Sequence, residues 1–461
     1  MFQFLTFVDL IVPPIFFIVF YFIAQSIKIR NLETNSSYKY YYPGLLVKLI
    51  ASVLICLVYV FYYEGGDTTS YYRDCVAISK CFLTHPFQMI KLSVSGVDAD
   101  VWYSFDFETG WPIYSYDVHA FWVDRLVWPL CFVSFHSFIA TTMLLSFICY
   151  QAIWRLYQTL VYEFPNLQRQ MAIAMFFIPS VVFWGSGILK DSITFAAVAL
   201  FISSIHTIIK LKKQIIRNIA YILFASFLLL KIKPYIFFAL LPGTSVWLAG
   251  FYLGKVENKL LKASIAPMFI MISAVAGYLV LGAIGNSLGD YRVENVLSKA
   301  VTTQQDLKQD YYGGSSFDIG DFDPTISGIL SKAPLAINAA LFRPYLWEGY
   351  NPGMLASGIE NFILLMLTIY LLLRIKVVNI FRLMFRHHFL FLSVTFSLFF
   401  AFSVGLTTSN FGSLVRYKIP AMPLYVASLY IIYSSYEELK AEDKEKVFLK
   451  EEGLEGKVPT A

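Results

Sequence analysis

The sequence predicts an all-α polytopic membrane protein. Of its 461 residues, 57% are hydrophobic and 18% are aromatic, whereas only 15% are charged, a composition well outside that of soluble globular domains. Apolar stretches long enough to cross a bilayer, which takes about 20 residues each, recur along the chain. Basic residues gather in alternate connections between these stretches, which is typical of a multi-pass membrane protein.

We expect about eleven membrane-spanning helices. They are predicted at Leu5–Ile27, Gly44–Tyr63, Leu126–Tyr150, Met171–Ser186, Ser192–Ile209, Asn218–Leu230, Pro234–Tyr252, Ser264–Ile284, Met354–Leu373, Phe389–Leu406 and Ile419–Tyr433. The first has neither a basic region before it nor a small-residue cleavage site after it, so it resembles a retained anchor rather than a signal peptide. Pro13 and Pro14 are expected to kink it.

The basic clusters fix an expected orientation. They lie near residues 28–30, 155–169, 210–217, 255–262 and 374–386. One consistent order of membrane crossings places all of these connections on the cytoplasmic side. The N-terminus is then outside and the C-terminus inside. Because these clusters account for the net charge of +5, we expect a lipid bilayer and no nucleic acid as a partner.

Two connections are long, at about 64–125 and 285–345, and both are predicted to be external. Long loops usually carry function, so we expect residues 1–433 to form a transmembrane catalytic domain and residues 434–461 a charged cytoplasmic tail. The first loop begins with helical spacing of apolar residues up to Pro86, which predicts an interfacial helix. Its remainder interleaves acidic and aromatic residues, which could stack on sugar rings or form an aromatic belt at the membrane boundary.

The first loop opens with Glu64, Gly65, Gly66 and Asp67, and these two carboxylates are the candidate catalytic groups. Acidic side chains at a membrane boundary are costly unless they are paired or used. A carboxylate there can act as a general base toward a hydroxyl group. The alternative for Asp67 is a helix cap.

Cationic motifs from distant parts of the chain are predicted to reach the same outer face. The candidate substrate-binding residues are Lys190, Asp191, Lys231, Lys233, Arg343, Arg416 and Tyr417. Lysine and arginine would hold an anionic phosphate or pyrophosphate group. As an alternative, Lys190 and Asp191 could pair with each other. Lys231 and Lys233, at the tip of the hairpin predicted between Asn218–Leu230 and Pro234–Tyr252, could extend to lipid headgroups. The two arginines could anchor the protein at the interface.

No metal or cofactor motif stands out. The chain holds no zinc spacing, phosphate-binding glycine loop or nucleophile elbow. The acidic run at 318–324 departs from calcium-loop spacing, which favours a solvated turn, with a divalent cation as the alternative. Cys75 and Cys81 would lie about 9 Å apart along one helix, too far for a disulfide. His136 and His206 are expected to pack or to form hydrogen bonds.

Four motifs resemble those of the GT-C class of polytopic glycosyltransferases, which includes polyprenyl-linked sugar transferases and O-antigen or exopolysaccharide polymerases. The motifs, in chain order, are Gly66-Asp67-Thr68-Thr69-Ser70-Tyr71-Tyr72, Gly185-Ser186-Gly187-Ile188-Leu189-Lys190-Asp191-Ser192, Leu230-Lys231-Ile232-Lys233-Pro234-Tyr235 and Arg416-Tyr417-Lys418-Ile419-Pro420-Ala421-Met422-Pro423. The resemblance implies that Asp67, with Glu64 as its competitor, is the catalytic base.

The resemblance implies an enzyme of the bacterial cytoplasmic membrane with its active face outside. It would move a sugar or oligosaccharide from a polyprenyl-(pyro)phosphate donor to a hydroxyl group of a glycan or lipid acceptor, in polysaccharide or glycolipid assembly. One alternative is a polysaccharide or lipid-linked oligosaccharide transporter or flippase without transferase activity, in which the same charges would line a path. Another is an acyltransferase with His136 or His206 as its base.

Overall fold

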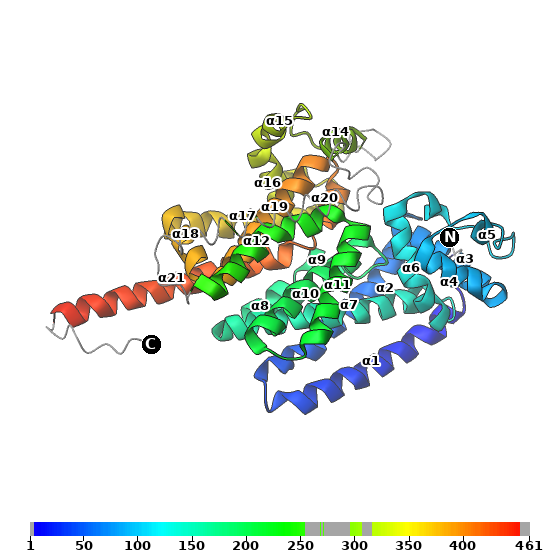
Figure 1. Ribbon diagram of the computed structural model, residues 1–461, viewed down its shortest axis with the longest axis horizontal. Helices are drawn as coiled ribbons and strands as arrows, with labels where there is room; N and C mark the ends of the chain where they lie inside the picture. The colour runs from blue at the N-terminus through cyan, green and yellow to red at the C-terminus, as the bar shows by residue number, and fades with distance from the viewer. Residues whose placement is uncertain (1–3, 254–267, 269–270, 272–295, 307–315, 452–461) are drawn as a thin grey trace.

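Helices make up almost the whole structure, as the composition predicts. The computed structural model describes residues 4–253, 268, 271, 296–306 and 316–451, and Figure 1 shows them as packed helices. The only pairing of extended residues in this part of the chain is an isolated bridge between Ser316 and Asn410. Eight of the described helical segments are long and apolar enough to cross a membrane. In this coarse form the prediction of an all-helical, multi-pass membrane protein is confirmed.

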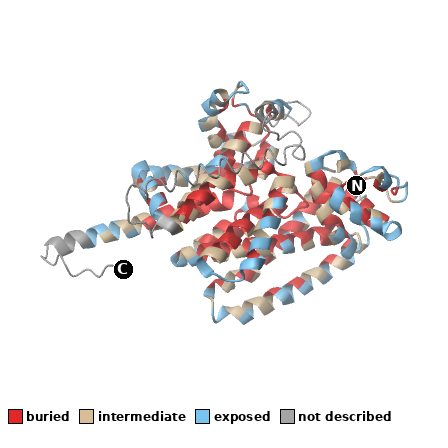
Figure 2. Cartoon of the chain, in the orientation of Figure 1, coloured by how far each residue is buried: buried red, intermediate tan, exposed pale blue. Residues whose placement is uncertain are grey.

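The eight segments contain the longest apolar helices of the described chain. They are α1 (Val8–Leu32), α2 (Tyr41–Phe61), α7 (Phe138–Glu163), α10 (Lys190–His206), α11 (Ile215–Ile232), α12 (Pro234–Leu253), α17 (Pro352–Ile375) and α19 (His388–Thr407). The first and last turns of these helices fall near the predicted boundaries in all but one case, α7. Helices α1, α11 and α17 leave most of their apolar surface uncovered (Figure 2), as lipid-facing helices would.

The shorter helices connect these segments. Before the middle of the chain they are η1 (Ser36–Tyr40), α3 (Asp67–Thr84), α4 (Pro86–Ser95), α5 (Ala99–Trp102), η2 (Ile113–Tyr116), α6 (Val118–Val133), η3 (Pro165–Leu167), α8 (Gln168–Phe176), α9 (Pro179–Trp184) and η4 (Thr207–Leu211). Later they are α14 (Val296–Asp306), α15 (Ile326–Ser331), α16 (Ala333–Phe342), η8 (Leu346–Glu348), α18 (Val377–Arg386) and α20 (Phe411–Tyr417). The helix expected before Pro86 is therefore present as α3.

The prediction of about eleven spans exceeds the eight that the described chain supports, and two expected spans are broken. Phe135 and His136 have positive φ angles of 54° and 58°, so the stretch predicted as Leu126–Tyr150 is divided between α6 and α7. The stretch predicted as Met171–Ser186 is divided between α8 and α9. Pro179 begins α9, and a proline disfavours helical geometry in the residue before it.

Two further expected spans differ for other reasons. The stretch Ser264–Ile284 lies outside the described residues, apart from positions 268 and 271. The stretch Ile419–Tyr433 falls mainly on α21 (Met422–Glu451), which is not among the eight apolar segments. Helix α21 is buried at its start and continues without a break into the charged region that was expected to begin at residue 434, so the tail extends a helix of the bundle (Figure 1).

The helices form two neighbouring groups. In the first group α7 packs against α1, α2 and α10, and α3 packs against α6. In the second group α19 packs against α12, α16 and α21. Contacts between α11 and both α10 and α12 join the groups. The site described below lies where these groups meet.

Charged side chains hold both ends of α9. Glu360 of α17 accepts hydrogen bonds from the Ser180 backbone N–H at 2.9 Å and from its hydroxyl at 2.5 Å. At the other end, Lys48 of α2 donates through Nζ to the Gly185 carbonyl at 2.5 Å. A carboxylate at the start and an ammonium at the end complement the helix dipole. This clamp fixes the segment that leads into α10.

Replacing Lys48 by methionine is expected to lower the thermal stability of the protein. The buried Gly185 carbonyl would lose its donor, and an unpaired buried polar group costs about 1–3 kcal/mol. The midpoint of thermal unfolding in detergent measures this loss. Lys39→Met removes an exposed lysine from the neighbouring η1 helix and serves as the control. Equal midpoints for the two variants would contradict the proposed role of Lys48.

Candidate functional site

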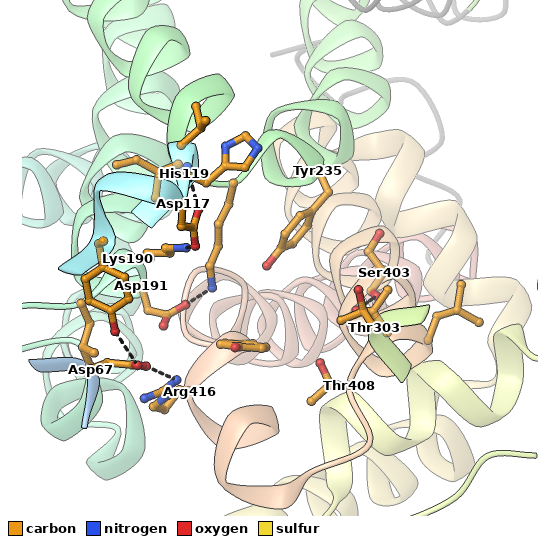
Figure 3. Close-up of a pocket in the computed structure, with 18 of the residues that line it drawn as sticks. Asp67, Asp117, His119, Lys190, Asp191, Tyr235, Thr303, Ser403, Thr408 and Arg416 are labelled. Carbon is orange, nitrogen blue, oxygen red and sulfur yellow. Dashed lines mark hydrogen bonds and ion pairs between the residues drawn. The ribbon is translucent and has the colours of Figure 1, made fainter. Parts of the chain in front are cut away.

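A cavity of about 840 Å³ lies between the two groups of helices (Figure 3). Its volume falls within the roughly 300–1,000 Å³ typical of small-molecule sites. Six of the nine predicted site residues line it, namely Asp67, Lys190, Asp191, Lys233, Arg416 and Tyr417. They come from α3, α10, the turn between α11 and α12, and α20. The fold thus brings four segments that are distant in sequence to one cavity.

Asp67 is the first residue of α3 and faces the cavity. The chain reaches it through Gly65 and Gly66, whose positive φ angles of 149° and 118° favour glycine. Its carboxylate is engaged by other segments: Oδ2 lies 2.8 Å from Arg416 Nη2, and Oδ1 accepts a hydrogen bond from the Tyr114 hydroxyl at 3.2 Å. Burial raises the pKa of Asp67, but the Arg416 guanidinium and these hydrogen bonds outweigh it and hold the pKa below its usual value.

Arg416 lies at the centre of the Asp67 cluster. Its Nη1 donates to the Tyr59 hydroxyl of α2 at 3.0 Å, while Nη2 forms the ion pair with Asp67. Its Nε is buried and has no hydrogen-bond partner among the described residues. The side chain is only 14% exposed. Arg416 as a residue lines the cavity, where a guanidinium can bind an anionic ligand.

Two further ion pairs line the same wall. Lys233 Nζ lies 2.5 Å from Asp191 Oδ1 and 4.1 Å from the centre of the Tyr417 ring. Lys190 Nζ lies 3.3 Å from Asp117 Oδ2. Lys190 therefore pairs with a residue of the first loop rather than with its neighbour Asp191, which answers one of the alternatives left open by the sequence. Each cation at the cavity has a carboxylate beside it.

Two helices begin at this wall without a side-chain cap. Helix α3 starts at Asp67 and helix α10 at Lys190, and neither has a side-chain hydrogen bond at its N-cap. The first N–H groups of a helix and its dipole favour anions. Helix α6 also begins at the cavity, but Asp117 caps it by accepting hydrogen bonds from His119 N and Ala120 N. The starts of α3 and α10 add positive potential to that of the three cations.

Glu64, Lys231 and Arg343 are not among the residues that line the cavity. Glu64 is exposed and has a positive φ of 56°. The carbonyl oxygen of Lys231 lies 2.7 Å from His119 Nδ1, a contact between the hairpin and α6.

Arg343 makes contacts of its own away from the cavity. Its Nε donates to Glu348 at 3.1 Å, and its guanidinium lies 4.6 Å from the centre of the Phe317 ring. The guanidinium also lies 5.3 Å from the centre of the Phe411 ring of α20, so Arg343 joins the later loop to α20 and supports local structure.

The aromatic first loop covers one side of the cavity. Tyr71, Tyr114 and Tyr116 line it, and the rings of Tyr71 and Tyr114 stack with their centres 4.5 Å apart. The sequence left open whether this loop stacks on sugar rings or forms an aromatic belt, and it did not single out Tyr114 or Tyr59 as partners of the ionic groups. One tyrosine among many in an aromatic-rich chain carries no signal of its own.

Asp74 tethers the loop to α3. Its Oδ1 accepts the Ile113 N–H at 2.8 Å and its Oδ2 accepts the Tyr114 N–H at 2.7 Å. Burial raises the pKa of Asp74 to about 6, although the backbone hydrogen bonds from Tyr114 and Ile113 act in the opposite direction. The carboxylate is thus largely ionised at neutral pH. It holds Tyr114 in the position from which its hydroxyl reaches Asp67.

Asp74→Ala is expected to release η2. Without the two acceptors, backbone N–H groups at residues 113 and 114 should exchange with deuterium at least tenfold faster, as measured by mass spectrometry of peptides covering η2. Asp106→Ala is a matched control, because Asp106 also accepts two backbone N–H groups, those of Glu108 and Thr109, in the exposed part of the loop. Unchanged exchange at η2 in Asp74→Ala would rule out the tether.

The histidines and cysteines have the roles expected of packed residues. His136 Nε2 lies 2.8 Å from the Ser79 hydroxyl, and His206 Nε2 lies 3.0 Å from Glu163 Oε1. Neither histidine lines the cavity. All five cysteines are buried and free, so the prediction that Cys75 and Cys81 form no disulfide is confirmed.

No group of three or more His, Cys, Asp or Glu side chains is placed to hold a metal ion within the described part of the chain. In the acidic run, Asp318 Oδ1 accepts the Gly320 N–H at 2.7 Å, a local turn contact.

Comparison with family models, curated proteins and solved structures found no match to this chain.

Proposed function

We propose that the protein is a membrane glycosyltransferase. It moves a sugar or oligosaccharide from a polyprenyl-(pyro)phosphate donor to a hydroxyl group of a glycan or lipid acceptor. The observation that carries this proposal is the gathering of Asp67, Lys190, Lys233 and Arg416 at one cavity beside apolar helices. An enzyme of this kind needs cations for a phosphate leaving group and a carboxylate for a hydroxyl proton.

The cations and helix starts support the binding of the donor phosphate. Lys190, Lys233 and Arg416 supply charged donors, and α10 begins with Lys190 at the cavity without a side-chain cap. Charge placed where the leaving group develops its negative charge stabilises the transition state. In the transfer step, the bond between the anomeric carbon and the phosphate oxygen breaks, and the electron pair leaves with the phosphate that these groups hold.

Asp67 is the general base of the proposal. The acceptor oxygen forms the new bond to the anomeric carbon, and its proton passes to the Asp67 carboxylate. While Arg416 holds Asp67, the low pKa of this carboxyl makes it a weak base. A donor phosphate in the cavity competes with Asp67 for the Arg416 guanidinium. Donor binding would therefore free the base for the acceptor.

The membrane location and the orientation of the protein are part of the same proposal. The orientation expected from the basic connections puts the cavity on the outer face of a bacterial cytoplasmic membrane, where polyprenyl-linked sugars serve polysaccharide or glycolipid assembly. The GT-C-like motifs at Asp67, Lys190, Lys233 and Arg416 support this assignment, because all four reach the cavity.

Reconstitution tests the proposal against a flippase. Purified protein in liposomes receives a radiolabelled polyprenyl-linked sugar together with a crude extract of membrane glycolipids as acceptor. A transferase forms a new glycosidic bond, seen as label that moves to the acceptor and stays there after mild acid releases sugar from the phosphate carrier. Passage of the donor across the bilayer without a new bond would overturn the proposal in favour of a transporter.

A further inference from the structure

The cavity has a second wall with different chemistry. Across from the ion pairs, it is lined by residues of α14, α15 and α19, none of which is charged. Figure 3 shows Thr303, Ser403 and Thr408 facing Asp191 and Arg416 across the open centre. Apolar side chains such as those of Phe402 and Leu406 lie among these hydroxyl groups. This α19 wall therefore suits a ligand that is neutral, polar and partly apolar.

The hydroxyl groups of the α19 wall are available to a ligand to different degrees. Ser403 donates to the Phe399 carbonyl at 3.0 Å and Thr407 donates to the Ser403 carbonyl at 2.9 Å, which leaves their oxygens free to accept. Thr408 is only 1% exposed, and its Oγ1 has no hydrogen-bond partner in the described part of the chain. Figure 3 shows its side chain directed toward the cavity. A buried hydroxyl of this kind is satisfied when a ligand supplies the partner.

The helix directions separate the two walls electrostatically. Helix α19 ends at Thr407 with Thr408 as its C-cap, so the negative end of its dipole faces the cavity beside the hydroxyl groups. Helices α3 and α10 present their positive ends on the opposite wall. The negative end of α19 thus disfavours an anionic group at the α19 wall.

The strand-like segment after α19 fixes the position of Thr408. The Phe317 backbone N–H donates to the Ser409 carbonyl at 2.8 Å, next to the bridge between Ser316 and Asn410. The rings of Phe317 and Phe411 stack with their centres 5.0 Å apart. These contacts with residues 316 and 317 hold the wall in place without a ligand, as binding sites that are formed in advance require.

We propose that the α19 wall, with Thr408 at its centre, is the acceptor subsite and takes a neutral polyhydroxylated group, that is, an uncharged sugar. This inference rests on the proposed function and adds where the acceptor binds. A sugar ring presents hydroxyl groups to Thr303, Ser403 and Thr408 and its C–H faces to the apolar side chains. Bound there, it faces Asp67 and the donor phosphate across the cavity.

Thiol protection tests the subsite. The five native cysteines are buried, so Ser403→Cys and Lys190→Cys each place one accessible thiol on one wall of the full-length protein in nanodiscs. Labelling by a small maleimide is followed with two probes. The first is a panel of neutral hexoses and N-acetylhexosamines, and the second is undecaprenyl phosphate. We expect saccharides to slow labelling at position 403 at least fivefold and to leave position 190 unchanged.

Removal of the Thr408 hydroxyl tests whether this group binds the saccharide. Thr408→Val, added to Ser403→Cys, is expected to raise the half-protecting saccharide concentration at least tenfold. Thr159→Val removes a buried threonine hydroxyl from α7, away from the cavity, and is the matched control. Thermal midpoints of all variants identify any that fail to fold, and for such a variant Thr408→Ser, which keeps the hydroxyl, should retain protection.

Each outcome has a distinct meaning. Saccharide protection that is equal at the two positions, or absent at both, would overturn the inference. So would protection of position 403 by undecaprenyl phosphate alone, because the α19 wall would then hold the lipid chain. The proposed function is checked separately on the protein that keeps Lys190: failure of the wild-type protein to bind undecaprenyl phosphate in native mass spectrometry would count against it, whatever the saccharides do.

Discussion

Asp67→Asn is expected to reduce sugar transfer about 10²- to 10⁴-fold, the usual contribution of a general base. Asparagine keeps the shape of the side chain, and its oxygen still accepts a hydrogen bond from Tyr114 or Arg416, but it cannot take the proton of an acceptor hydroxyl. The loss should therefore appear in kcat, and the affinity for the donor should not fall, because the phosphate no longer competes with a carboxylate for Arg416. Transfer from a radiolabelled polyprenyl-linked donor in liposomes measures it, at equal amounts of folded protein.

Glu64→Gln is the matched control, since the two carboxylates are three residues apart and only one lines the cavity. Glu64 is exposed, so its variant should keep the wild-type rate. A wild-type rate in Asp67→Asn, or the loss of transfer in Glu64→Gln instead, would show that Asp67 is not the base.

The ion pair between Asp67 and Arg416 also bears on the order in which donor and acceptor bind. A carboxylate that is held by a guanidinium is a poor proton acceptor, so the proposed base is restrained in the absence of the donor. The cations of α10 and of the α11–α12 turn line the cavity beside this pair, where a phosphate would bind. Binding order, with the donor before the acceptor, follows from this arrangement.

Much of the fold was predictable because apolar length and basic connections report directly on membrane crossing. The hairpin at Lys233 was predicted from the pattern Lys-Ile-Lys-Pro, and α11 and α12 meet there. The break at Phe135 and His136 had only a weak signal, the short run Ser134-Phe135-His136-Ser137, which the long apolar stretches on either side outweighed. The break before Pro179 had a visible signal in the proline itself, which the apolar run outweighed.

Part of the candidate site could also be predicted from the sequence. Charged residues in an apolar chain are few, so the motifs around Asp67, Lys190, Lys233 and Arg416 could be identified from sequence. Which of the charged residues meet depends on tertiary packing. Arg343 looked equivalent to Arg416, but its partner Glu348 lies five residues away in the same loop. The α19 wall gave no sequence signal, because serine and threonine within an apolar helix usually bond to their own helix.

Arg416→Met is expected to weaken binding of undecaprenyl phosphate about ten- to a hundredfold. A hydrogen bond to a charged group contributes about 1.5–3 kcal/mol, and tenfold in affinity corresponds to about 1.4 kcal/mol. The same change removes the cation that lowers the pKa of Asp67, so the pKa of this buried carboxyl should rise. Any remaining transfer activity should then need a higher pH than in the wild type. Native mass spectrometry measures lipid binding, and a pH series of initial rates measures the shift.

Arg343→Met provides the contrast that makes the Arg416 result specific. Both changes remove an arginine whose side chain is mostly buried, with exposed fractions of 19% for Arg343 and 14% for Arg416. Arg343→Met leaves Glu348 without its partner and should lower the thermal midpoint, yet lipid affinity and the pH dependence of the rate should stay at wild-type values. Equal losses of lipid affinity in the two variants would mean that Arg416 acts through folding alone. A loss confined to Arg416, with the pH shift, requires its guanidinium to contact both the donor phosphate and the base.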